Sequence, residues 1–186
     1  MSTATAATDN TLATGTWKID RVHSHVGFAV KHMVVSTFRG RFDDYDGQLT
    51  VGADGKPRLE GWVSVDSLAV QDENLAAHLT SPDFFDGQRY PRLRFASSSV
   101  RVGDGGELEV EGELEIKGHK RPVIARGSVS GPHVDIAGND KLGVELETTV
   151  DRREFGLEWN AELPQGGVAL ANDVTLEVSL ELVREA

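Results

Sequence analysis

The chain has 186 residues, enough for one ordinary globular domain that buries about two-thirds of the surface of its unfolded chain. It contains no cysteine, which excludes a disulfide framework, a thiolate metal site and a cysteine nucleophile. The formal net charge is −11, from 30 acidic residues and 19 lysines and arginines. Such a charge disfavours binding to nucleic acid and docking on anionic membranes.

The N-terminal stretch, residues 1–14, is small and polar. It has neither the basic start nor the apolar core of a secretory signal, so we predict a disordered tail followed by one domain over residues 15–186. No apolar run approaches the roughly 18 residues that a membrane span requires. We therefore expect a protein that does not span a membrane and that resides in the cytoplasm.

Alternation of polar and apolar residues predicts β-strands along most of the chain. In residues 107–116, ELEVEGELEI, the glutamates fall on one face and the apolar side chains on the other. Residues 141–150 and 173–182 repeat this pattern, which places much of the excess acid on outward faces. Further strands are predicted at 15–20, 24–33, 38–51, 58–66, 92–102 and 121–130.

One helical segment interrupts the strands, in QDENLAAHLTS. Leu75, Ala76 and Leu79 recur at helical spacing before Pro82, which predicts a small helical insertion near residues 72–85. Residues 160–173, which contain a Gly-Gly pair, are predicted to form a loop before the last strand.

About eight long antiparallel strands, each with one apolar face, must stack as a sandwich or close into a barrel. Strands of about ten residues favour the barrel, because closure removes long exposed edges that would aggregate. The fold class predicted is all-β, with mostly up-and-down connections interrupted at residues 67–91.

The histidines of residues 16–32, TWKIDRVHSHVGFAVKH, suggest two alternatives. His23 and His25 share a strand face and, with a third ligand, would bind a metal; with Asp20 and His32 they would support an enzyme, either a metal-assisted hydrolase or an isomerase acting on a small apolar substrate. However, His32 has the opposite parity, so the three do not converge. We favour a polar corner of Asp20, His23 and Ser24, and no metal or other cofactor.

The segment HLTSPDFFDGQRYPRLRF carries aromatic and basic residues after the predicted helix. Phe84 and Phe85 would either plug one end of the core or line the opening of a pocket. Arg89, Arg92 and Arg94 would be solvated or would meet an anionic head group. No motif for a serine nucleophile, a zinc protease or a phosphate loop is present, so no catalytic residue is assigned and the protein is not expected to be an enzyme.

Four ordered stretches resemble the YceI family: IDRVHSHVGFAVKHMVVSTFRGRF, HLTSPDFFDGQRYPRLRF, GELEIKGHKRPV and VDRREFGLEWN. The resemblance runs from about Thr16 to Glu181. It implies an extended eight-stranded antiparallel, lipocalin-like barrel with a small helical insertion. It also implies binding of a long isoprenoid, either a polyprenyl phosphate or an isoprenoid quinone, by a carrier or store. Some members are periplasmic and linked to stress, and the resemblance allows a homodimer.

One departure affects the polar end of that ligand. Many family members carry Arg-Asp-x-His-Leu at the start of the insertion, whereas this chain reads Leu75-Ala76-Ala77-His78-Leu79. A role for the charged pair therefore cannot be transferred.

The residues predicted to contact the ligand are inward-phased or belong to the insertion. In the first long strand, Lys31 is expensive to bury without a partner, so its face should be the outer one and the face of Phe28 the inner one. The predicted ligand contacts are Val26, Phe28, Val30, His32, Phe38, Phe42, Trp62, Phe84, Phe85, Arg89, Phe95 and Leu114.

Overall fold

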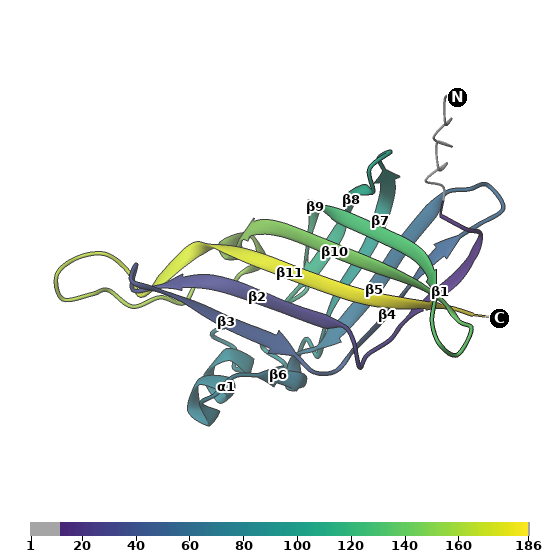
Figure 1. Cartoon of the computed structure of the whole chain (residues 1–186). Helices are drawn as coiled ribbons and strands as arrows, with labels where there is room; N and C mark the ends of the chain where they lie inside the picture. The colour runs from purple at the N-terminus through teal and green to yellow at the C-terminus, as the bar shows by residue number, and fades with distance from the viewer. Residues whose placement is uncertain (1–11, 186) are drawn as a thin grey trace, which may run out of the picture.

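The computed structural model describes residues 12–185, which form a closed antiparallel barrel with eight strand positions (Figure 1). The predicted fold class is thus confirmed. The strands are β1 Gly15–Ile19, β2 His25–His32, β3 Ser36–Phe42, β4 Tyr45–Val51, β5 Pro57–Ser64, β6 Leu68–Ala69, β7 Arg92–Val102, β8 Glu107–Ile116, β9 His119–Val134, β10 Asp140–Asp151 and β11 Leu170–Arg184; the helix is α1 Glu73–Thr80, and the 3₁₀ turns are η1 Val65–Ser67 and η2 Arg152–Phe155.

Three of the eight positions hold two strand segments each. β1 and β2 lie end to end along β11, with Ile19 opposite Leu182 and His25 opposite Ser179. β3 and β4 lie in the same way against β2 and β1, and β5 and β6 form the next position. Each strand then neighbours the next in sequence, and β11 closes the ring on β1 and β2. The up-and-down order is as predicted.

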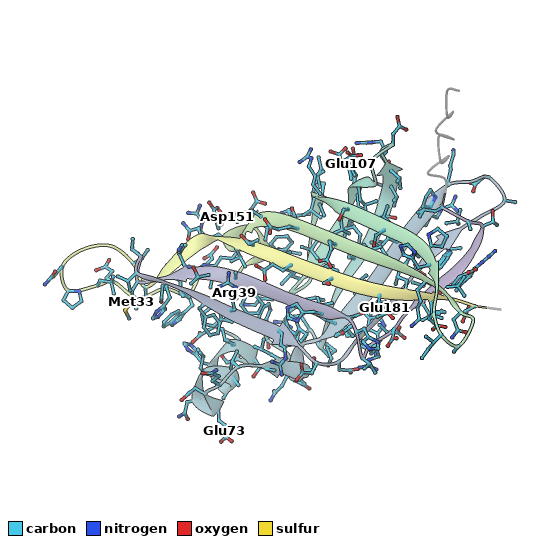
Figure 2. The ribbon with its side chains drawn as sticks, in the orientation of Figure 1. Met33, Arg39, Glu73, Glu107, Asp151 and Glu181 are labelled. Atoms are coloured by element: carbon cyan, nitrogen blue, oxygen red, sulfur yellow. The ribbon has the colours of Figure 1, made fainter. Side chains whose placement is uncertain are left out.

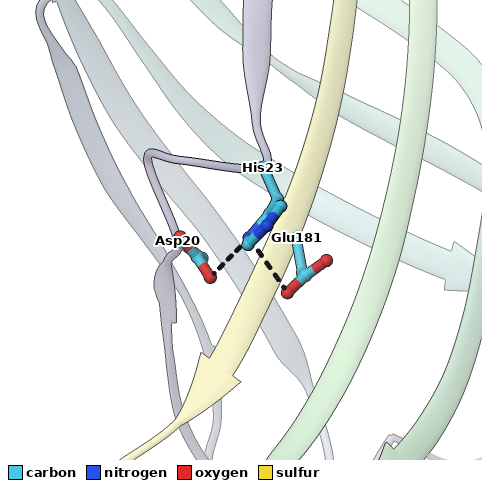
Figure 3. A group of neighbouring side chains, drawn as sticks. All are labelled: Asp20, His23 and Glu181. Carbon is cyan, nitrogen blue, oxygen red and sulfur yellow. Dashed lines mark hydrogen bonds and ion pairs between the residues drawn. The ribbon is translucent and has the colours of Figure 1, made fainter. Parts of the chain in front are cut away.

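The break between β1 and β2 is a polar corner (Figure 3). Asp20 Oδ2 lies 3.0 Å from His23 Nδ1, and Ser24 Oγ accepts a hydrogen bond from the backbone N–H of Glu181. Lys141 Nζ donates to Asp20 Oδ2 at 3.0 Å and to Glu181 Oε1 at 2.8 Å. The hydrogen bonds from His23 and Lys141 hold the pKa of Asp20 well below its usual range. The corner therefore fastens the interrupted strand to β10 and β11.

Replacing Asp20 by asparagine should lower the free energy of unfolding by about 1 kcal/mol at pH 7, because a charge-assisted contact is lost. A carboxyl with a depressed folded-state pKa stabilises fully above its ordinary pKa, 3.8, and loses that contribution as the pH falls toward the folded-state value. The difference between wild type and Asp20→Asn should therefore shrink below about pH 4. Urea unfolding at pH 7 and pH 3 measures it; an equal difference at both pH values would contradict the assignment.

The barrel interior is solid at one end. Trp17, Leu142 and Leu182 are fully buried there with neighbours from β4, β8 and β11, and none of the three borders the cavity described below. Leu12 and Ala13, which fall in the predicted tail, pack against this cluster, and Trp17 Nε1 donates to the Ala13 carbonyl. Residues 1–11 of that tail lie outside the described part of the chain.

The helical insertion closes one side of the barrel. α1 begins after Asp72, whose carboxylate accepts a hydrogen bond from the backbone N–H of Leu75 at 2.8 Å and so caps the helix. It ends before Pro82, and Leu79, Phe84 and Phe85 are buried against the barrel. Lys117 Nζ donates to the Pro82 carbonyl and ties the insertion to the turn between β8 and β9. Over residues 12–185, no helix has the length and apolar character to cross a membrane.

Candidate ligand-binding cavity

The other end of the barrel is hollow. It encloses a cavity of about 700 Å³, within the usual range for small-molecule sites, and its walls are almost entirely aliphatic and aromatic. Met33, Ser36 and Ala161 line the cavity and are also exposed, so it opens at the end that holds the β2–β3 turn. We call this opening the mouth. Figure 1 shows the β2–β3 turn at the end of the barrel opposite β1.

The β2–β3 hairpin supplies one wall. Val26, Phe28, Val30 and His32 face the cavity, while Lys31 is exposed, as the strand phase predicts. A Cβ on Gly40, which lies opposite Phe28, would come within 2.6 Å of Phe28 Cζ. Glycine at position 40 thus makes room for an aromatic ring between the two strands.

The insertion supplies the facing wall. The Phe85 ring centroid lies 6.3 Å from that of Phe28 and 6.0 Å from that of Phe42, both in edge-to-face geometry. Phe84 packs on Trp159 at 5.4 Å between centroids. Phe84 and Phe85 both line the cavity. They therefore close the side of the barrel and also form a wall of the pocket.

Phe95 forms the floor. A Cβ on the inward-facing Gly112 of β8 would meet the Phe95 ring at 2.5 Å. The space that a glycine leaves at this level is therefore filled by Phe95, which packs against both the solid end and the hollow end. Leu59, Leu146 and Leu180 of the solid end also line the cavity, so the cavity ends against that cluster and opens at the mouth.

Arg152 is the one buried charged residue of the described chain, and the sequence interpretation did not select it. Its Nη1 donates to the carbonyls of Leu157, at 2.6 Å, and Trp159, at 2.8 Å, and its Nε donates to the carbonyl of Ala171 at 2.9 Å. The adjacent Asp151 is engaged by Arg153, which lowers the pKa of Asp151 to about 2. Arg152 is thus held by neutral carbonyls and borders the cavity. Within residues 12–185, no carboxylate forms an ion pair with its guanidinium.

His32 and Arg152 meet β11 at neighbouring residues. The backbone of His32 pairs with Leu170, and Arg152 bonds to the next residue, Ala171. The His32 ring lines the cavity and has no hydrogen bond within residues 12–185. Between them, the two side chains offer hydrogen bonds to the polar end of a ligand at the mouth.

Most of the predicted contacts border the cavity, and two positions differ from expectation. Arg89 is exposed, and its guanidinium lies 5.6 Å from the centre of the Tyr90 ring, outside the lining. Trp62 touches the edge of the cavity but pairs with Asp46 and Arg94, which face outward. The residues that border the cavity are Val26, Phe28, Val30, His32, Phe38, Phe42, Trp62, Phe84, Phe85, Phe95 and Leu114.

The expected inward phase of Trp62 is wrong because Leu59 and Val63 are the buried residues of β5, and the residue between Gly61 and Val63 must point outward. The guanidinium of Arg92 stacks on the Trp62 ring at 3.8 Å. Arg92 is therefore an outer-face residue.

The histidines do not assemble into one site. His23 belongs to the polar corner, His25 is exposed on the outer face of β2, and His32 lies at the mouth. Asp20, His23 and Glu181 lie close enough to share a cation, but the Lys141 ammonium already bridges the two carboxylates. The enzyme hypothesis gains no support from this arrangement.

Solved structures with the same fold have low sequence identity. Burkholderia cenocepacia BcnA matches with a TM-score of 0.74 at 20% identity, covering 88% of this chain and 98% of that one. The Campylobacter jejuni YCEI protein matches with 0.71 at 22%, covering 90% and 97%. A polyisoprenoid binding domain from Saccharophagus degradans, implicated in plant cell wall breakdown, matches with 0.68 at 12%, covering 91% and 98%. These matches show the shared fold.

Curated relatives match at the level of sequence. A UPF0312 protein of Staphylococcus aureus is 30% identical over 167 residues, covering 87% of this chain and 94% of the relative. A UPF0312 protein of Pseudomonas putida is 29% identical over 175 residues, covering 91% and 86%. The family model described as the YceI-like domain matches residues 17–182, which is nearly the whole barrel. The chain belongs to the YceI-like family.

Proposed function

We propose that the protein binds a long apolar chain of the isoprenoid type inside the hollow half of the barrel and acts as its carrier or store in the cytoplasm. The observation that carries the proposal is the apolar cavity of about 700 Å³, closed below by Phe95 and open at the mouth. Membership of the YceI-like family supports it, and so does the name of the Saccharophagus degradans domain.

The energetics suit a chain-shaped ligand. Burying about ten methylene-sized groups at roughly 0.8 kcal/mol each gives about 8 kcal/mol, which corresponds to micromolar affinity before ordering costs. Longer chains would bind more tightly until the floor at Phe95 is reached.

We assign the polar end of the ligand to the mouth, beside Arg152 and His32. An apolar chain that fills the cavity leaves its head group where these two side chains lie. A guanidinium held by carbonyls favours an anionic acceptor such as a phosphate over a neutral one. This assignment replaces the head-group role expected of Arg89.

Organic extraction of purified protein, followed by mass spectrometry, should release a long-chain lipid with a polar end. Protein freed of lipid should take up a fluorescent polyprenyl phosphate at micromolar concentration, and a soluble dye of similar size without a chain should not bind. Protein that arrives empty and takes up no polyprenyl probe would refute the proposal.

A further inference from the structure

The tip of the β2–β3 hairpin is apolar, exposed and strained. The turn has two central residues, Met33 and Val34, with φ angles of 50° and 65°, and Val35 N donates back to the His32 carbonyl at 3.2 Å. Turns with two positive φ angles favour Asn-Gly, and a β-branched residue in this region is an outlier. Val34 and Val35 are nevertheless 82% and 87% exposed. Neither turn geometry nor core packing accounts for these residues.

This tip forms part of the mouth. Met33 lines the cavity, and its N–H donates to the Ala169 carbonyl at 2.7 Å, which joins the turn to the loop that precedes β11. That loop adds Val168, which is also exposed. Figure 2 shows Met33 at the end of the hairpin, beside the base of this loop, which extends further outward. We call Met33, Val34, Val35 and Val168 the mouth tip.

The strands behind the mouth tip are basic, although the chain as a whole is acidic. Residues 21–42 contain no aspartate or glutamate. Lys31 and Arg39 are exposed on the outer face of the hairpin, and within residues 12–185 neither has an ion pair or a side-chain hydrogen bond. Two basic residues of β9 differ, since Lys120 and Arg126 pair with Glu113 and Glu109 of β8. The hairpin therefore presents unpaired cations beside exposed apolar side chains.

We propose that the mouth tip docks on a bilayer that contains anionic lipids, with Val34 and Val35 inserted among the head groups and Lys31 and Arg39 at the surface. The inference rests on the proposed function: a water-insoluble chain would then pass between bilayer and cavity without crossing water. Apolar side chains backed by basic ones are the composition that binds such an interface. The acidic residues on distant faces do not prevent this docking, because their charges are screened beyond about 8 Å at physiological salt.

The size of the tip favours a bilayer over a protein partner. A stable protein interface buries about 800 Å² on each side, from 20–30 residues. The mouth tip offers four side chains, which suits shallow insertion. A second copy of the chain is the competing occupant, and the experiment below separates the two.

Flotation of lipid-free protein with vesicles of phosphatidylcholine and phosphatidylglycerol tests the proposal. The wild type should float with these vesicles, and less with phosphatidylcholine alone. The double variant Val34→Gly and Val35→Thr should lose about tenfold in partitioning while folding as well as the wild type, because glycine suits a positive φ. The double variant Lys31→Gln and Arg39→Gln should lose about tenfold in partitioning on anionic vesicles only.

The matched control is Ile136→Ser, in the β9–β10 turn at the solid end. Ile136 is fully exposed and apolar but remote from the mouth, so this variant should float like the wild type. A wild type that does not float, a tip variant that floats equally, or a control that loses as much would each overturn the proposal. So would light scattering that shows a dimer lost in the tip variant. Uptake of a polyprenyl probe in solution is measured separately. A protein that takes up the probe but does not float would contradict the membrane docking alone, and a protein that takes up no probe would contradict the proposed function.

Discussion

Replacing Phe28 with aspartate should abolish uptake of a polyprenyl probe and lower the free energy of unfolding by roughly 3–5 kcal/mol or more. Phe28 is 8% exposed, and its ring lies within 6.3 Å, centroid to centroid, of the rings of Phe38, Phe42 and Phe85. The substitution removes these contacts and places a carboxylate without a partner among apolar walls. Urea unfolding and probe titration measure the two effects.

The matched control is His25→Ala on the opposite face of the same strand. His25 is exposed, so the change should stay within about 0.5 kcal/mol and leave uptake intact. Because Phe28→Asp also lowers stability, Phe28→Leu provides the second measurement. It keeps an apolar wall, should fold, and should weaken binding of the probe by changing the shape of the cavity. A neutral Phe28→Asp together with a damaging His25→Ala would contradict both the strand phase and the container function.

The alternation of residue types was sufficient to predict the strands, and their length favoured a barrel over a sandwich. Residues 107–116 and 92–102 were predicted as strands and are β8 and β7 with those same bounds. A strand with one wet and one dry face has a fixed phase, which is why Lys31 marked the outer side of β2. The interruptions within strand positions were harder to foresee. Residues 38–51 read as one strand, but β3 ends at Phe42 and β4 begins at Tyr45, because the chain bends at the two aspartates between them.

Side-chain volumes inside the barrel could not be predicted from one strand at a time. Gly112 leaves space on the inward face of β8, but the ring that fills this space comes from β7, where Phe95 lies opposite Leu114 and reaches across. Trp62 was predicted to be inward-phased, although the parity of Leu59 and Val63 puts it outside. Where a residue's type and its strand parity disagreed, parity was correct.

Arg152 was missed for a different reason. In VDRREFG, two arginines follow a strand, and sequence patterns assign such residues to the surface. Asp151 accepts hydrogen bonds from the backbone and side chain of Arg153, so Arg153 takes the exposed position. Arg152 turns inward because the segment after η2 and the start of β11 present three carbonyls to it. No local signal distinguishes the two arginines; the tertiary arrangement of those carbonyls does.

Arg152→Met should therefore have two separable effects. The first is structural: the carbonyls of Leu157, Trp159 and Ala171 lose their donor, and a buried acceptor left unpaired costs about 1–3 kcal/mol. Urea unfolding should show a loss in this range or above. Arg153→Met, which removes an exposed neighbour of the same type, should change stability much less than Arg152→Met.

The second effect concerns ligand choice and is measured as a ratio, which a general loss of stability does not alter. Wild-type protein should bind a polyprenyl phosphate more tightly than the polyprenol of equal chain length, because the guanidinium meets the phosphate at the mouth. A charged hydrogen bond of about 1.5–3 kcal/mol corresponds to a preference of roughly tenfold to a hundredfold. Arg152→Met should reduce that ratio to near one while the polyprenol still binds, and Arg152→Lys should retain part of it. If Arg152→Met keeps the full preference for phosphate, the head group lies elsewhere and Arg152 serves only to hold η2 against β11.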